Sequence, residues 1–104
     1  MTRTANCIRG ECELHLGDRT VLLRPSFENL VAAEGEVGSL FALVERASQG
    51  TLTINEVCAL LWHCIADDPR PSRDEVGEAV IEQGLIATTK PVRAILAQVL
   101  QGQA

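Results

Sequence analysis

The chain has 104 residues, an apolar share of 46 % and a formal net charge of −5. A chain of this length builds one modest core, and its apolar share is too high for a disordered protein, so we expect a single domain over residues 1–104. The negative charge, with basic residues that form no run, argues against binding to nucleic acid or to anionic membranes.

The sequence contains no stretch that approaches the ~20 apolar residues of a membrane span. Its N-terminus leads into charged residues rather than into an apolar signal core, so we expect a cytoplasmic protein with residues 1–8 as a loose leader. Thiols stay reduced in the cytoplasm, and we interpret the four cysteines as small buried hydrophobic residues. They are Cys7, Cys12, Cys58 and Cys64.

The first expected element is a β-hairpin over residues 10–24. Apolar and polar residues alternate on both sides of Gly17, which is the pattern of two strands that each bury one face. Gly17 fits the two-residue turn between them because glycine adopts a positive φ without strain. We expect Val21 and Leu23 to face inward, and Pro25 to end the second strand because it has no N–H to donate.

Helical periodicity replaces the strand pattern after Pro25 and predicts a bundle of about five short helices over residues 26–101. Capping residues mark where each helix starts and stops. The first helix should start at Ser26 and stop near Gly35, and the second should run from Gly38 or Ser39 to Gly50. The third should run from Thr53 to Ile65 and the fourth from Ser72 to Gly84. The last helix should start after Thr88-Thr89, with Pro91 in its first turn.

Two of these helices have informative apolar patterns. The third is apolar nearly all round, so we expect it to be the central, most buried helix. The last has one amphipathic stripe, formed by Val92, Ile95, Leu96, Val99 and Leu100. The sequence therefore predicts an α+β fold that is predominantly α: an N-terminal β-hairpin followed by about five short helices.

Cysteine and histidine residues are the strongest candidates for a metal or thiol site. They fall into two groups, Cys7, Cys12 and His15, and Cys58, His63 and Cys64. Zinc motifs favour ligand pairs two to four residues apart, whereas Cys58 and Cys64 would lie roughly 240° apart around a helix. We therefore expect no metal and no cofactor, and a small metal-binding or thiol protein is the less favoured alternative.

Acidic residues offer no better catalytic site. Glu75, Glu78 and Glu82 form a row at helical spacing, which a solvated helix face explains better than acid–base catalysis does. The sequence also has no glycine-rich phosphate-binding motif, so we expect no catalytic residues and no enzyme.

Apolar surface is the remaining candidate for function. We predict partner contacts at large apolar side chains near capped helix ends, although core positions are the simpler interpretation of Phe41 and Trp62. The predicted contacts are Leu40, Phe41, Val44 and Trp62.

Three segments resemble a family of small proteins from gene transfer agents and related prophages. They are Gly-Glu-Cys-Glu-Leu at 10–14, Leu-Leu-Arg-Pro-Ser-Phe-Glu-Asn-Leu at 22–30 and Val-Gly-Glu-Ala-Val-Ile-Glu-Gln-Gly-Leu at 76–85. The resemblance covers about residues 10–100. Members of the family are encoded among tail genes and are described as tail assembly chaperones, sometimes as tail tube proteins.

The resemblance implies a tail assembly chaperone that shields apolar helices of the tape measure protein in the bacterial host cytoplasm. Tail tube subunits need many alternating strands, and the sequence offers only two, so a tube-building role is less favoured. A structural tail or head–tail component retained in the particle is the alternative. The sequence leaves the oligomeric state open, a homo-oligomer included.

Overall fold

The computed structural model describes residues 12–17, 19–67 and 69–101, and it begins with the expected hairpin. Strand β1 (Cys12–Leu16) pairs antiparallel with strand β2 (Arg19–Leu23), and Leu14 lies opposite Val21. Gly17 has φ +65°, the left-handed conformation that favours glycine at a hairpin turn. The leader expected at 1–8 lies outside the described residues.

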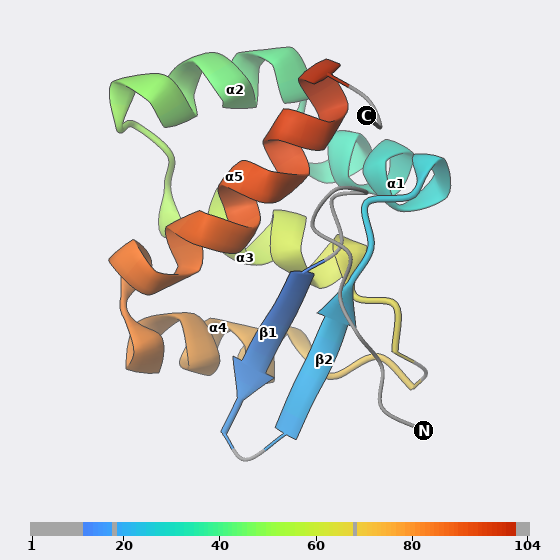
Figure 1. Cartoon of the computed structure of the whole chain (residues 1–104), viewed down its shortest axis with the longest axis vertical. Helices are drawn as coiled ribbons and strands as arrows, with labels where there is room; N and C mark the ends of the chain where they lie inside the picture. Colours follow the sequence, from blue (N-terminus) through green and yellow to red (C-terminus); the bar gives the residue numbers. More distant parts are fainter. Residues whose placement is uncertain (1–11, 18, 68, 102–104) are drawn as a thin grey trace.

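Five helices follow the hairpin (Figure 1). They are α1 (Phe27–Val37), α2 (Leu40–Gln49), α3 (Ile54–Cys64), α4 (Arg73–Gln83) and α5 (Leu85–Gln101). The α+β, predominantly α fold predicted from the sequence is therefore confirmed. Among the described residues, no helix combines the length and the apolar character needed to cross a membrane.

Local capping chemistry sets most helix limits where the sequence placed them. The Ser26 hydroxyl accepts a hydrogen bond from the Asn29 N–H at 3.2 Å, and Thr53 and Ser72 each form a complete capping box. These side chains satisfy N–H groups that have no partner within the helix. Gly50 ends α2 in the left-handed conformation, as expected of a C-terminal cap.

The predicted end of the first helix was wrong. Helix α1 passes through Gly35 and ends only at Val37, where Gly38 with φ +87° closes it. Glycine inside a helix costs about 1 kcal/mol, which weakens the helix without ending it. Val37 packs against the core, and this burial favours the additional residues of helix.

The predicted start of the last helix was also wrong. Helix α5 begins at Leu85, directly after Gly84, and Pro91 lies inside it. The hydroxyls of Thr88 and Thr89 donate to the Leu85 carbonyl at 3.1 and 2.8 Å, so both side chains follow helical geometry. Thr88 is also buried, which favours extending the helix through it despite the hydrogen bond that Pro91 cannot make.

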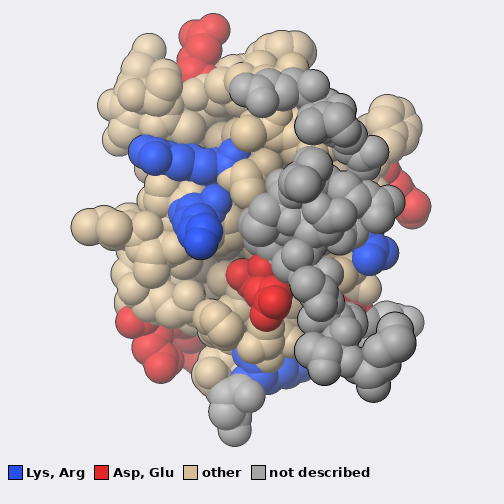
Figure 2. Space-filling model, in the orientation of Figure 1, with Lys and Arg blue, Asp and Glu red and all other residues tan. Residues whose placement is uncertain are grey.

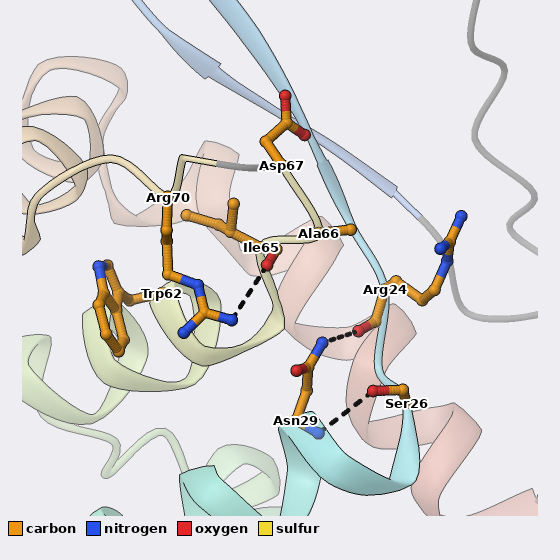
Figure 3. A pocket seen from close by; sticks show the side chains of 8 residues that line it. All are labelled: Arg24, Ser26, Asn29, Trp62, Ile65, Ala66, Asp67 and Arg70. Carbon is orange, nitrogen blue, oxygen red and sulfur yellow. Dashed lines mark hydrogen bonds between the residues drawn. The ribbon is translucent and has the colours of Figure 1, made fainter.

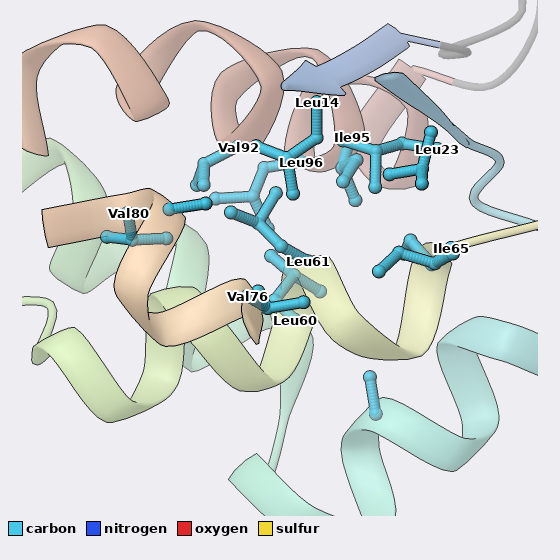
Figure 4. Close-up of a cluster of buried hydrophobic side chains, with 14 of the residues drawn as sticks. Leu14, Leu23, Leu60, Leu61, Ile65, Val76, Val80, Val92, Ile95 and Leu96 are labelled. Carbon is cyan, nitrogen blue, oxygen red and sulfur yellow. The ribbon is translucent and has the colours of Figure 1, made fainter. Parts of the chain in front are cut away.

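The core forms around α3, which contacts α1, α4 and α5 (Figure 4). This confirms α3 as the central helix. The core contains side chains from the hairpin, from α3 and the residue after it, and from α4 and α5. They include Leu14, Leu23, Leu60, Leu61, Ile65, Val76, Val80, Val92, Ile95 and Leu96. Four of the five residues of the expected α5 stripe contribute to the core, with Val99 half-buried and packed against it, whereas Leu100 is exposed at the end of the helix.

The outer edge of β2 is covered by the chain that leaves α3. Leu23 forms an isolated antiparallel β-bridge with Ile65, and the Ala66 N–H donates to the Leu22 carbonyl at 2.8 Å. The Asp67 carboxylate accepts a hydrogen bond from the Leu22 N–H at 2.9 Å. The end of β2 around Leu22 is therefore paired with the chain after α3 and is not open to another strand. Like Val21 and Leu23 beside it, Leu22 is buried.

Candidate partner-binding surfaces

The four predicted partner contacts do not form one surface. On α2, Leu40 is 5 % exposed and belongs to the core, whereas Phe41 is 68 % exposed and Val44 is half-buried. Leu40 and Leu43, three positions apart, make the buried face of the helix, and Phe41 lies outside it. Of the three residues on α2, Phe41 offers a partner the most surface.

Trp62, on α3, lies in a different environment from the α2 residues. Its indole N–H donates to the Pro71 carbonyl at 2.9 Å. The guanidinium carbons of Arg70 and Arg73 lie 4.6 and 4.3 Å from the centre of its ring, which is cation–π distance. Trp62 therefore anchors the segment before α4 to α3, which explains why it is half-buried.

Next to Trp62, three charged or titratable side chains join α1, α3 and α4. Arg73 donates through both terminal nitrogens to the Glu36 carboxylate, and His63 Nε2 lies 2.8 Å from Glu36 Oε1. The hydrogen bonds from Arg73, and then the contact with His63, lower the pKa of Glu36 to about 2. Glu36 therefore stays ionised in any neutral medium and supports the packing of three helices.

An open pocket lies beside Trp62, between the end of α3 and the start of α1 (Figure 3). Its lining residues are Arg24, Ser26, Asn29, Trp62, Ile65, Ala66, Asp67 and Arg70. The Asn29 amide donates to the Arg24 carbonyl and Arg70 donates to the Ile65 carbonyl, while the Arg24 side chain points away from Arg70. These polar groups serve the fold and do not converge on a ligand.

The cysteine and histidine candidates are spread over several environments. Cys64 is buried and Cys58 half-buried on α3, and burial raises the pKa of both thiols, that of Cys64 to about 12. His15 is exposed on the hairpin with Nδ1 3.0 Å from the Thr20 hydroxyl. The side chains of Cys7 and Cys12 lie outside the described part of the chain. Within that part, no three His, Cys, Asp or Glu side chains are grouped so that they could hold a metal ion.

Large apolar side chains are exposed on all five helices. They are Phe27, Val31, Phe41, Ile54, Ile81, Leu85, Ile86 and Leu100. Sequence reasoning selected only Phe41 among them, because periodicity does not show which apolar side chain a neighbouring helix covers. A position directly after a cap was a usable signal: Phe27 follows the N-cap Ser26, and Leu85 follows the C-cap Gly84.

The acidic side chains are unevenly distributed on the surface. On the face shown in Figure 2, one group of Asp and Glu side chains gathers at the lower left, the region where α4 lies in Figure 1. The carboxylate row noted in the sequence, Glu75, Glu78 and Glu82, is on α4 and exposed. The described surface thus combines exposed apolar side chains on the helices with an acidic region on α4.

Residues 9–102 match the protein family described as "Phage tail tube protein, GTA-gp10". The chain belongs to this family. The match covers nearly the whole chain and confirms, at the level of a phage or gene-transfer-agent tail family, the resemblance found in three short segments. Searches of curated proteins and of solved structures found no significant match.

Membership in a tail protein family gives the exposed apolar surface a context. A tail protein family suggests interaction with other tail proteins, and the buried centres of protein interfaces are more apolar than the rest of the surface and enriched in aromatic side chains. The exposed apolar side chains on the helices are therefore the candidate partner contacts of this family member.

Proposed function

We propose that this protein is a tail assembly chaperone that covers apolar helical segments of the tape measure protein until the tail tube forms around it. The observation that carries the proposal is the exposure of at least one large apolar side chain on each of the five helices of a tail-family protein. Covering these side chains with an apolar helix removes their area from water, which favours binding. The role requires no catalysed reaction.

The mechanism is reversible shielding. Apolar faces of a client helix pack against apolar helix surface of this protein, and growing tube subunits then displace it. The net charge of −5 on a chain of this size keeps the loaded complex dispersed by mutual repulsion. The host cytoplasm, where the particle is assembled, is the proposed location.

The first test of this proposal is a substitution of Phe41, the most exposed of the predicted contact residues on α2. Phe41→Asp removes an exposed apolar side chain near the start of α2 and should leave the fold intact, with a stability change within about 0.5 kcal/mol. The variant is expected to lose co-purification with the tape measure protein. Ala42→Asp, which adds the same charge at the next exposed position, is the matched control and should retain it.

A failure of the wild-type protein to bind the tape measure protein, or any other tail protein, would remove the chaperone proposal. Unfolding of Phe41→Asp would instead identify Phe41 as a core residue. Val44 and Trp62, both half-buried, are secondary contacts in this proposal, whereas Leu40 is a core residue and offers a partner almost no surface.

The second candidate is a structural tail component that stays in the particle, which the family description as a tail tube protein favours. The fold argues for the chaperone, because the described residues contain one two-stranded sheet where a tube-building subunit needs many strands. Mass spectrometry of purified particles separates the two roles. Stoichiometric presence in the particle supports the structural component, and absence supports the chaperone.

A further inference from the structure

A shallow groove lies along α4, bordered by the first residue of α3. Its apolar floor is formed by Ile54 of α3 and Ile81 of α4, which are 46 % and 62 % exposed. These two side chains come from different helices and face the same hollow. Covering them would remove apolar area from water, which is the usual driving force of association.

Gly77 lies in the middle of the groove and in the interior of α4. A glycine there weakens the helix by about 1 kcal/mol relative to alanine. Nothing in the described chain requires this cost, because a Cβ built at Gly77 would meet no atom within 4 Å. Its effect is to leave bare helix backbone at the floor of the groove, where another helix can approach closely.

Carboxylates line the same groove. Asp74, Glu78 and Glu82 are exposed, and none has a hydrogen-bond or ion-pair partner among the residues that the structure describes. The groove's one basic side chain, Arg73, is bound to Glu36. The free charge of the groove is therefore negative, which favours a positively charged occupant and disfavours nucleic acid or an anionic lipid surface.

We propose that this groove binds an amphipathic helix of a partner protein whose apolar stripe is flanked by Lys or Arg residues. The apolar stripe covers Ile54 and Ile81, the helix approaches most closely at Gly77, and its basic side chains pair with Glu78 and Glu82. From Asp74 to Glu82 the groove follows about two helical turns, enough for anchors at i, i+3, i+4 and i+7. This inference rests on the proposed function, since it assigns to the client a second contact area on α4, apart from Phe41 on α2, and the chemistry of the helix that binds there.

The test uses the full chain, labelled with ¹⁵N, and two synthetic helices of about 18 residues, long enough to be helical. Both peptides carry the same leucine stripe, flanked by lysine in one and by glutamate in the other. The lysine peptide should shift the amide resonances of Ile54 and of α4, and its affinity should fall as salt rises. The glutamate peptide should bind about tenfold more weakly or not at all.

Two substitutions test the groove directly. Gly77→Leu fills the point of closest approach, should raise the melting temperature because leucine favours helix, and should weaken the lysine peptide by about tenfold or more. Gly35→Leu is the matched control: Gly35 is also inside a helix with open space at its Cβ, and this variant should bind as the wild type does. Glu78→Gln with Glu82→Gln should weaken binding about 3- to 10-fold at low salt.

Several outcomes would overturn the groove assignment. In the titrations, these outcomes are resonance shifts by the lysine peptide that map to α1 or α2, and equal binding of the two peptides. In the variants, the outcome is a loss of peptide binding in Gly35→Leu rather than in Gly77→Leu. Self-association of the chain that Gly77→Leu abolishes would show that a second copy of the chain occupies the groove. Retention of the tape measure protein by Gly77→Leu, with its loss in Phe41→Asp, would overturn this inference and leave the proposed function standing. Failure of the wild type to bind any tail protein would remove the proposed function, while the peptide titration would still test the groove.

Discussion

Glu36, near the end of α1, accepts hydrogen bonds from both terminal nitrogens of Arg73, at the start of α4 and 37 positions away in the sequence. Arg73 also lies 4.3 Å from the centre of the Trp62 ring on α3. One arginine thereby connects three helices, and its guanidinium is held in place by a carboxylate and an aromatic ring.

This pairing makes stability depend on pH through Glu36. The pKa of Glu36 is lowered from 4.5 to about 2 in the folded chain, first by the hydrogen bonds from Arg73. A carboxyl group whose pKa is lower in the folded state than in the unfolded state stabilises the fold while it is ionised. This stabilisation is fully present above the unfolded-state pKa of 4.5 and is lost as the pH falls from about 4.5 towards 2. Glu36→Gln should therefore lower the free energy of unfolding at pH 7 by about 1 kcal/mol, a small figure because the pair is partly exposed.

Urea unfolding of wild type and Glu36→Gln at pH 7 and at pH 2 measures this effect. The difference between the two proteins should be present at pH 7 and should shrink at pH 2, where Glu36 is substantially protonated in both states. Glu45→Gln, which removes one negative charge at an exposed glutamate on α2, is the control and should change the free energy of unfolding at pH 7 by less than Glu36→Gln does. A Glu36→Gln difference of the same size at both pH values would contradict the assignment.

The two capping boxes should differ in strength. Glu56 accepts from the Thr53 N–H at 2.9 Å and is also paired with Arg46 of α2. Among the described residues, Glu75 contacts only the N-cap Ser72, through longer hydrogen bonds of 3.4 Å. Glu56→Ala therefore removes the side-chain half of the capping box and a link between α2 and α3, while the Thr53 hydroxyl still caps the helix. It should cost about 1 kcal/mol more than Glu75→Ala in urea unfolding. Equal costs would show that the Arg46 pair contributes nothing.

Most of the fold could be predicted from the sequence because its signals are local. A serine or threonine N-cap such as Thr53 acts on N–H groups three residues away, and a glycine such as Gly50 ends a helix through its own φ. The two wrong limits depend on distant contacts instead. Helix α1 continues past Gly35 because Val37 packs on the core, and α5 starts early around the buried Thr88.

The candidate binding residues were harder to predict, because exposure is a property of the packed structure. Leu40 and Phe41 are neighbours in the sequence with similar apolar character, yet the first is buried and the second is exposed. Ile54 of α3 and Ile81 of α4 line the same groove, although they belong to different helices. The apolar pattern within a single helix cannot predict such an arrangement. Trp62 was selected for its size, but its surroundings are set by Arg70 and Arg73 beyond the end of its helix.

The thiol of Cys64 should be unreactive in the folded protein. Burial raises its pKa to about 12, so almost no thiolate exists at pH 8, and the side chain is inaccessible. Iodoacetamide followed by peptide mass mapping should modify Cys64 only after the chain is unfolded in denaturant. Rapid labelling of Cys64 under native conditions would show that the end of α3 opens readily and would contradict its place in the core.

At the edge of the hairpin, the Asp67 carboxylate accepts a hydrogen bond from the Leu22 N–H at 2.9 Å. Leu22 is buried, so removing the acceptor leaves a donor with little access to water. Asp67→Ala should lower the free energy of unfolding by about 1 to 2 kcal/mol, whereas Asp67→Asn, which keeps an Oδ1 acceptor, should cost less than half of that. Amide hydrogen exchange gives the local readout, because the Leu22 amide should exchange faster in the alanine variant than in the asparagine variant. Equal protection of the Leu22 amide in both variants would show that the carboxylate does not hold this edge, and that the main-chain bonds of Ala66 and Arg24 to the chain around it are sufficient.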